Sequence, residues 1–337
     1  MTTDAAPHQP VAQTVYRPAH PVDLMRTVGM LVRGPNDPTM LIDGGRLWLA
    51  FRTGNGIASL CLRQDSHGIH AAAWGPGADE AIDRMPQVCG ADDDLTGFDV
   101  SAHAGLAAIA RRFPGIRLPR TDLVFEALAC AILEQKVTGL QAFGAWRYLV
   151  TNFGERTPGP TPRPMFAAPA AESWRSIPSW HWHRAGVEPP QSRTIVRAAS
   201  RAPSIVRALH AASDGDDRDQ VLTSQPGIGQ WTSAETRLRA LGDPDAVALG
   251  DAHLPHEIGF ALTGSRTDDA GMLELLSPWA GHRQRVIRLV YAAGIREPRR
   301  GPRLAPKTTG AVDAASPRRN GVSGDTRRND RSGRRSR

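Results

Sequence analysis

The hydrophobic pattern of the chain changes near residue 99, and this change restricts the possible folds more than any other feature. Residues 39–75 contain strand-like segments in close succession, namely "TMLIDGGRLWLAFRT", "GIASLCLRQ" and "GIHAAAWG". From residue 100 to residue 295 no strand-like alternation occurs, and apolar residues recur at helical spacing instead. The sequence therefore predicts an α+β chain. A small N-terminal α/β domain with an antiparallel sheet covers residues 14–98, and an all-α domain covers residues 100–295.

Turn residues and short amphipathic segments complete the predicted N-terminal domain. Asp43-Gly44-Gly45 separates two strand-like runs, and this pairing is typical of a β-hairpin. The segment "HPVDLMRTVGMLVR" has helical apolar spacing, and "GADEAIDRMPQVCG" predicts a short helix. We therefore expect the sheet to be accompanied by two helices.

Prolines and glycines divide the predicted helical domain. A long helical stretch over 122–154 is expected to break near Val137-Thr138-Gly139. The prolines at alternate positions in "TPGPTPRPMFAAPAA" predict a loop, and Pro203 predicts a break between two helices. Gly294 is the expected C-cap of the last helix. Residues 296–337 contain almost no large apolar side chain, so we expect a disordered basic tail.

Charge is distributed unevenly along the chain. Residues 296–337 contain 13 Arg or Lys and 4 Asp or Glu, a net charge of +9, whereas the whole chain carries +7. The remainder is slightly acidic, so a nucleic-acid surface on the folded part requires a local arrangement of basic residues. The N-terminal residues lack the charged and apolar regions of a secretory signal, so we expect none, and no apolar run has the length that spans a bilayer. We expect a monomeric protein of the cytoplasm, associated with the nucleoid and not with a membrane.

The cysteine content excludes two kinds of site. The three cysteines, Cys61, Cys89 and Cys130, are far apart in sequence. This spacing predicts neither a disulfide framework nor a CxxC metal site, and three residues cannot ligate a four-cysteine iron–sulfur cluster. The histidine pairs in "WHWH" and "HLPH" lack a matching set of further ligands, so we expect no metal site.

The segment "TSQPGIGQWTSAE" predicts a helical hairpin. In Pro226-Gly227-Ile228-Gly229 the glycines permit positive φ and a close approach of another backbone. Helices are expected over 219–225 and 230–241. The amides of Gly227 and Gly229 would then point outward and bind a phosphate without contacting a base. The alternative is an ordinary turn between two helices.

Asp251 is the candidate catalytic residue. It follows Gly250, 22 residues after Gly229, in "ALGDAHLP". One interpretation is a helix N-cap, because Asp accepts hydrogen bonds from backbone amides there. The other is a carboxylate that stabilises the positive charge of an oxocarbenium-like sugar or orients a water molecule. The two interpretations are compatible.

Together these segments resemble the helix-hairpin-helix DNA glycosylase superfamily, in particular its bacterial 3-methyladenine DNA glycosylase II (AlkA-type) branch. The resemblance lies in "LTSQPGIGQWTSAETRLRALGDPDAVALGDAHL", "RLPRTDLVFEALACAILEQKVT" and "SPWAGHRQRVIRLV". It implies a monofunctional DNA N-glycosylase that flips alkylated purines, of the 3-methyladenine and 7-methylguanine type, out of double-stranded DNA and excises them in base excision repair. The alternatives are a glycosylase for other damaged bases and a non-catalytic protein that recognises damage.

The resemblance also assigns roles to individual residues. Trp231 occupies the position at which the lyase-type members have a nucleophilic lysine. The resemblance therefore implies that Trp231 forms a wall of the base pocket and that Trp279 is the second aromatic residue of this pocket. For both, the alternative is packing in the core. Gln135 matches a residue that approaches the minor groove, and Lys136 replaces an apolar wedge.

The hairpin residues Gly227, Ile228 and Gly229 form the implied DNA contact. The turn carbonyls are an implied site for a monovalent cation, and no other cofactor is expected. The element "LSPWAGHR" departs from the branch, because Leu276 replaces a tryptophan and Ala280-Gly281 replaces Arg-Ser.

Overall fold

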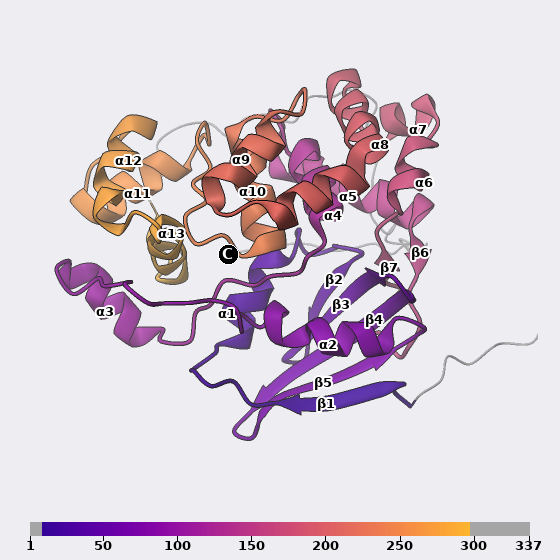
Figure 1. Cartoon of the computed structure of the whole chain (residues 1–337), viewed down its shortest axis with the longest axis horizontal. Coiled ribbons are helices and arrows are strands. Elements are labelled where there is room, and N and C mark those ends of the chain that lie inside the picture. Colours follow the sequence, from indigo (N-terminus) through magenta and orange to yellow (C-terminus); the bar gives the residue numbers. More distant parts are fainter. Residues whose placement is uncertain (1–8, 297–337) are drawn as a thin grey trace, which may run out of the picture.

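The computed structural model describes residues 9–296 (Figure 1). The antiparallel sheet forms one part of the molecule and most of the helices form the other (Figure 1). The helical segments between residues 24 and 88 pack against the sheet. The expected α+β architecture is confirmed. The predicted basic tail, apart from Arg296, lies outside the described residues. Among those residues, no helix is both long and apolar enough to cross a bilayer.

The N-terminal part is a five-stranded antiparallel sheet with the order β1-β5-β4-β3-β2. The strands are β1 (Ala12–Tyr16), β2 (Met40–Asp43), β3 (Arg46–Thr53), β4 (Gly56–Asp65) and β5 (Gly68–Trp74). α1 (Leu24–Val28), a 3-10 turn (Gly29–Leu31) and α2 (Ala78–Val88) accompany the sheet. The expected hairpin joins β2 to β3, and Gly44 and Gly45 both have positive φ there, as a type I′ turn requires.

The edge strand β1 differs from expectation, because it begins two residues before the predicted domain start at residue 14. Val11, next to it, and Val15 within it are exposed, and three of the five strand residues are exposed. No clear apolar alternation therefore marks this strand. It is defined by backbone pairing with β5, from Ala12 opposite Ala73 to Tyr16 opposite Ile69.

Helices make up most of the chain after residue 100. They are α3 (Ala104–Arg112), α4 (Val124–Leu133), α5 (Gly139–Phe153), α6 (Ala171–Arg175), α7 (Ser179–Arg184), α8 (Pro189–Ala211), α9 (Gly215–Thr223), α10 (Gln230–Thr236), α11 (Leu254–Thr263), α12 (Asp269–Leu276) and α13 (Arg283–Ala292). α10 continues as a π-helical turn (Arg237–Leu241), and a 3-10 turn (Ser277–Trp279) follows α12. The break predicted near Val137-Thr138-Gly139 is confirmed, and Thr138 caps α5.

The helical part is not all-α as predicted. β6 (Glu155–Arg156) pairs with β7 (Phe166–Ala167), and these two strands bracket the proline-rich loop. Met165 and Ala167 are buried in one cluster with Trp48 and Trp74 of the main sheet. Strands of two residues are too short to show a period of two, so the sequence pattern could not predict them.

Pro203 does not break a helix, contrary to expectation. α8 runs without interruption from Pro189 to Ala211, with Pro203 exposed inside it. The buried face of α8, which includes Ile195, Ile205 and Leu209, packs into the largest hydrophobic cluster of the helical part. This packing outweighs the loss of one helical hydrogen bond at the proline.

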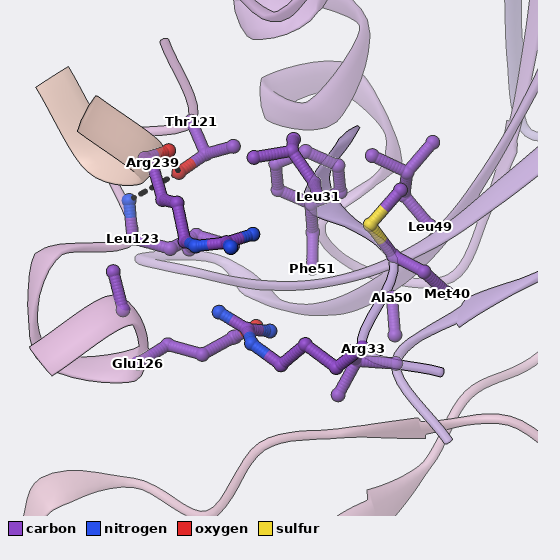
Figure 2. A pocket seen from close by; sticks show the side chains of 12 residues that line it. Leu31, Arg33, Met40, Leu49, Ala50, Phe51, Thr121, Leu123, Glu126 and Arg239 are labelled. Atoms are coloured by element: carbon purple, nitrogen blue, oxygen red, sulfur yellow. Dashed lines mark hydrogen bonds and ion pairs between the residues drawn. The ribbon is translucent and has the colours of Figure 1, made fainter. Parts of the chain in front are cut away.

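The sheet and the helices meet at a buried polar junction (Figure 2). A cavity of about 20 Å³, room for one water molecule, is lined there by residues of both parts, including Arg33, Glu126 and Arg239. Arg33 Nη1 donates to Glu126 Oε1 at 3.3 Å, and the guanidinium lies 4.7 Å from the centre of the Trp146 ring. Arg239 Nη1 donates to the Met30 carbonyl at 2.9 Å. Charged side chains thus fix the position of the helices relative to the sheet.

Candidate active site and nucleic-acid interface

The predicted helical hairpin is present, with α9 and α10 on either side of the turn. Gly227 has φ +90, and a Cβ atom at this position would overlap the Thr194 hydroxyl of α8. Gly229 is the N-cap of α10, and the space around its Cα is open. Only Gly227 is therefore required to be glycine by the geometry of the turn.

The three turn residues have different roles in the structure. The Ile228 N–H donates to the Gln225 carbonyl at 3.1 Å, and the Ile228 side chain is buried. Ile228 thus stabilises the turn, and the expectation that it contacts DNA does not fit this placement. Within residues 9–296 no hydrogen bond engages the N–H of Gly227 or Gly229. Both amides are free to bind an anion at the start of α10.

Asp251 and Trp231, which are 20 residues apart in sequence, meet in the structure. Trp231 Nε1 donates to Asp251 Oδ2 at 3.0 Å. Asp251 Oδ1 accepts from the backbone amides of His253 and Leu254, at 2.8 and 2.9 Å. Asp251 therefore binds two amides at the start of α11 from two residues before His253, which is the N-cap residue of that helix. The contact with Trp231 ties the same carboxylate to the hairpin helix α10.

The carboxylate is oriented and still able to interact further. Oδ1 accepts two hydrogen bonds, but Oδ2 accepts only the one from Trp231 within the described residues. Oδ2 therefore keeps a lone pair for a ligand or a water molecule. Trp231 is only partly buried, and its single N–H is used on Asp251. The indole can thus contact a base only through its ring.

Sequence reasoning missed Tyr291 of α13 as a member of this region. Burial raises the pKa of the Tyr291 hydroxyl well above its usual value, and the nearby carboxylates of Glu257 and Asp251 raise it further. Glu257 is buried on α11 and accepts from Arg296 Nη1 at 2.6 Å. Tyr291 follows Asp251 by 40 residues and belongs to no motif, so only the tertiary fold brings it there.

Gln135 joins the link between α4 and α5 to the hairpin. Its Nε2 donates to the Gly227 carbonyl at 3.0 Å and to the Thr232 hydroxyl at 2.8 Å. Both side-chain N–H groups are therefore used within the protein, and Oε1 accepts no hydrogen bond from residues 9–296. The sequence suggested a DNA contact here, and the structure leaves only Oε1 for it.

Lys136 is exposed at the tip of the same link. Its φ is +57, and Asp122 is the only other non-glycine residue with positive φ in the described part of the chain. A left-handed conformation costs a lysine about 1 kcal/mol or more. The structure thus presents Lys136 on a strained, exposed turn beside the hairpin.

Trp279 lies in the core cluster against which Trp231 and Tyr291 also pack. Its side chain is 9% exposed, and its Nε1 donates to the Asp99 carbonyl at 2.8 Å. The ring packs in the hydrophobic cluster of α11, α12 and α13 and meets the edge of His103. This burial favours the core alternative for Trp279, and a role in the base pocket stays a prediction.

The turn carbonyls were a candidate site for a monovalent cation. The Gln225 carbonyl accepts from Ile228 N–H and the Gly227 carbonyl accepts from Gln135, while Arg197 Nη1 lies 3.5 Å from the Pro226 carbonyl. A cation would share these oxygens with three donors, one of them positively charged. Each of these carbonyls accepts one hydrogen bond and keeps a second lone pair, so a monovalent cation at the turn stays a prediction. Among the described residues, no group of three His, Cys, Asp or Glu side chains could bind a metal.

Two curated proteins are similar to the chain in sequence, whereas no model of a protein family matches it. One is a probable bifunctional transcriptional activator/DNA repair enzyme AlkA of Mycobacterium tuberculosis, 28% identical over 155 residues, which are 46% of this chain and 31% of the relative. The other is a DNA-3-methyladenine glycosylase of Bacillus subtilis, 25% identical over 208 residues, which are 56% of this chain and 63% of the relative. The chain thus spans less than two thirds of each relative's length.

Solved structures show the fold. A 3-methyladenine DNA glycosylase from Archaeoglobus fulgidus superposes with a TM-score of 0.66 at 16% identity, over 83% of this chain and 97% of that chain. The chain therefore has the fold of this DNA glycosylase. An 8-oxoguanine glycosylase/lyase from Clostridium acetobutylicum superposes with a TM-score of 0.65 at 10% identity, over 83% and 95% of the two chains. Since both superpose equally well, the fold does not distinguish alkylated from oxidised bases.

Proposed function

We propose that this chain is a monofunctional DNA N-glycosylase that acts as a monomer on double-stranded DNA and excises alkylated purines, of the 3-methyladenine and 7-methylguanine type, in base excision repair. The observation that carries the proposal is the hydrogen bond from Trp231 Nε1 to Asp251 Oδ2. It joins an oriented carboxylate to a hairpin whose turn has free amides. The names of the Bacillus subtilis relative and of the Archaeoglobus structure include 3-methyladenine and support the same substrate class, and the name of the Mycobacterium relative supports a role in DNA repair.

Each part of the region has a role in the proposed reaction. The free amides of Gly227 and Gly229 bind a phosphate, and the damaged nucleotide rotates out of the duplex toward Asp251. An alkylated purine is cationic, so the ring face of Trp231 attracts it. The bond between the sugar C1′ and the base nitrogen breaks, and its electron pair neutralises the departing base.

Asp251 acts on the sugar that remains. Its negative charge stabilises the positive charge that develops at C1′ as the base leaves. A water oxygen then bonds to C1′ and passes its proton to the carboxylate or to solvent. Because the alkylated base is already a good leaving group, no strong general acid is needed.

The residue at position 231 supports a monofunctional enzyme. A lyase needs an amine that attacks C1′ and forms a Schiff base. Trp231 has no such amine, and Lys136 is the only lysine among residues 1–296. Borohydride should therefore trap no covalent adduct on alkylated DNA, and the product strand should stay intact. A trapped adduct that disappears in Lys136→Ala would contradict this part of the proposal.

The main test is Asp251→Asn. Asparagine keeps an oxygen for the amides of His253 and Leu254, so the fold should be retained while the charge is lost. We expect release of methylated bases to fall by a factor on the order of 10² or more, the size of one lost electrostatic stabiliser. The measurement is chromatography of bases released from methylated DNA under single-turnover conditions.

A matched control separates charge at the site from loss of a helix cap. Asp268 caps α12 through an oxygen that accepts from the Gly271 amide at 2.9 Å, and no contact joins it to Trp231. Asp268→Asn should leave base release unchanged. If the Asp251 variant also retains the wild-type rate, the catalytic assignment is wrong. If the wild-type protein releases no base from methylated DNA but binds it, the non-catalytic alternative replaces this proposal, and release from oxidised DNA alone favours the other glycosylase class.

A further inference from the structure

One helix carries an unusual concentration of positive charge. α8 has Arg193, Arg197, Arg201 and Arg207 but no Asp or Glu among its 23 residues. The described residues outside it are acidic on balance, because the whole chain carries +7 and the segment from residue 296 alone carries +9. α8 is therefore a local basic feature of the kind that a slightly acidic protein needs in order to bind nucleic acid.

The four arginines share one exposed face, which we call the arginine row. Their spacings of four, four and six residues place them within an arc of about 120° around the helix. All four side chains are exposed, whereas the opposite face, with Ile195, Ile205 and Leu209, is buried in the core. None of the four forms an ion pair with an acidic side chain of residues 9–296. Their charges are thus unpaired and available to an anionic partner.

The arginine row is continuous with the hairpin turn. Thr194 packs against Gly227, Arg197 Nη1 lies 3.5 Å from the Pro226 carbonyl, and Arg201 Nη1 donates to Gln225 Oε1 at 3.2 Å. Figure 1 shows α8 beside α9 and α10. A strand whose phosphate is bound at the turn would therefore lie close to the start of the row.

We propose that the arginine row binds the phosphate backbone of the DNA duplex next to the damaged base, as an extension of the contact at the hairpin turn. This inference rests on the proposed function for its choice of DNA as the partner. Four residues of helix rise about 6 Å, and successive phosphates of one strand rise about 3.4 Å, so neighbouring arginines reach different phosphates. Guanidinium groups bind phosphate oxygens in bidentate fashion and without regard to base sequence. The row lengthens the footprint on DNA and takes no part in the chemistry.

The test measures how the affinity for an undamaged 20-base-pair duplex depends on salt concentration. The full-length chain is compared with a variant in which all four arginines are replaced by glutamine. Each lost phosphate contact lowers the slope of log affinity against log salt by about 0.9, so we expect the slope to fall by about 2 to 4. Arg111→Gln on α3 is the matched control, because Arg111 is also an exposed helical arginine and α3 lies at the opposite end of the view in Figure 1. Arg111→Gln should lower the slope of log affinity against log salt by less than about 0.9, the value of one phosphate contact.

A second variant avoids disturbing the turn. Ser200 and Ser204 are exposed on the same face, and their hydroxyls bond only to backbone carbonyls of α8. The double replacement Ser200→Glu and Ser204→Glu leaves every arginine in place but introduces two negative charges. We expect at least a tenfold loss of duplex affinity at low salt. The double replacement Ser200→Gln and Ser204→Gln adds no charge and should have little effect.

The outcomes decide between the possibilities. The inference is overturned if the glutamate pair binds duplex as tightly as wild type, or if the folded four-arginine variant keeps the wild-type slope. Single-turnover excision at saturating protein should stay within about twofold of wild type in the glutamate-pair variant and in Arg111→Gln, because none of the substituted residues contacts the hairpin turn. If wild type excises nothing while the row variants still lose salt dependence, the proposed function fails and the DNA surface remains.

Discussion

At the scale of single residues, the contact between Trp231 and Asp251 makes a direct prediction. Trp231→Phe keeps an aromatic face but removes the N–H that binds Asp251 Oδ2. A hydrogen bond to a charged group contributes about 1.5–3 kcal/mol, so a carboxylate that loses one should be less well oriented. We expect base release to slow by about tenfold or more, measured by single-turnover excision from methylated DNA.

Trp279→Phe is the control for the loss of an indole N–H. It removes the bond to the Asp99 carbonyl inside the core and should lower the free energy of unfolding without changing the excision rate. Equal effects of the two variants on excision would show that the Trp231 bond has no special role in orienting Asp251.

Individual site residues were predictable from sequence only where a local motif contained them. Asp251 and Trp231 were each found from the hairpin segment and its downstream glycine, but their mutual hydrogen bond crosses 20 residues and has no sequence signal. Trp279 lies in a short motif, where a tryptophan is equally compatible with a pocket and with the core in which the structure buries it. Tyr291 was missed because an amphipathic helix pattern shows which face is buried and not what lies opposite it.

At the scale of elements, the hairpin turn predicts opposite behaviour for its two glycines. In Gly227→Ala the new methyl group would overlap the Thr194 hydroxyl, and φ +90 is strained for alanine. We expect a loss of about 2 kcal/mol or more of unfolding free energy, together with weaker DNA binding. Gly229→Ala has open space and φ −99, so its stability should change by less than about 0.5 kcal/mol.

Denaturant unfolding of both variants and their affinities for an undamaged duplex provide the measurements. The pair is informative because both substitutions add the same methyl group to the same turn. If Gly229→Ala destabilises as much as Gly227→Ala, the close packing of α8 against the turn is not what requires glycine at position 227.

Helices and long strands were predictable, but the elements that depend on partners elsewhere were not. The hairpin between β2 and β3 follows from two glycines, and the start of α5 follows from Thr138 and Gly139. β1, β6 and β7 show little local pattern, because pairing with distant segments creates them. Pro203 does not break α8 as expected, because packing of the buried face stabilises the helix on both sides of the proline.

At the scale of the whole molecule, the junction between sheet and helices predicts a dependence of stability on pH. Burial raises the pKa of Glu126 from 4.5 to about 6, although Arg33 beside it acts in the opposite direction. Between these two pH values the folded protein binds more protons than the unfolded chain, so the contribution of Glu126 to stability falls as pH rises through this window. Above pH 6 the contribution stays at its lower level.

Comparison with Glu126→Gln isolates this effect from the other carboxylates. The free energy of unfolding of wild type minus that of the variant should be about 2 kcal/mol more favourable to wild type at pH 4.5 than at pH 7. Urea unfolding at pH 4.5, 5, 6 and 7 measures the difference. A constant difference would mean that folding does not change the pKa of Glu126, and a difference that grows toward neutral pH would mean that Arg33 outweighs burial and lowers the pKa.

Charge at the C-terminal end makes the last prediction. Residues 297–337 contain 12 Arg or Lys and 4 Asp or Glu, a net charge of +8. Such a segment should bind phosphates without sequence preference and release counterions as it does so. Arg296 is the last described residue, and it bonds to Glu257 and lies 4.8 Å from the centre of the Tyr291 ring. The informative truncation therefore ends after Arg296 and not after Gly294.

We expect the chain truncated after Arg296 to bind undamaged duplex more weakly and with a flatter salt dependence, while its single-turnover excision rate at saturating protein stays at the wild-type value. Truncation after Gly294 should also lower the stability, since Glu257 is buried and loses its partner. If the chain truncated after Arg296 keeps the wild-type salt slope, the basic segment does not engage DNA. It is then a solvated extension without a role in binding. A collapse of the excision rate of this truncated chain would show instead that residues beyond 296 belong to the active structure, because binding at saturation no longer limits the reaction and only the geometry of the site remains to be affected.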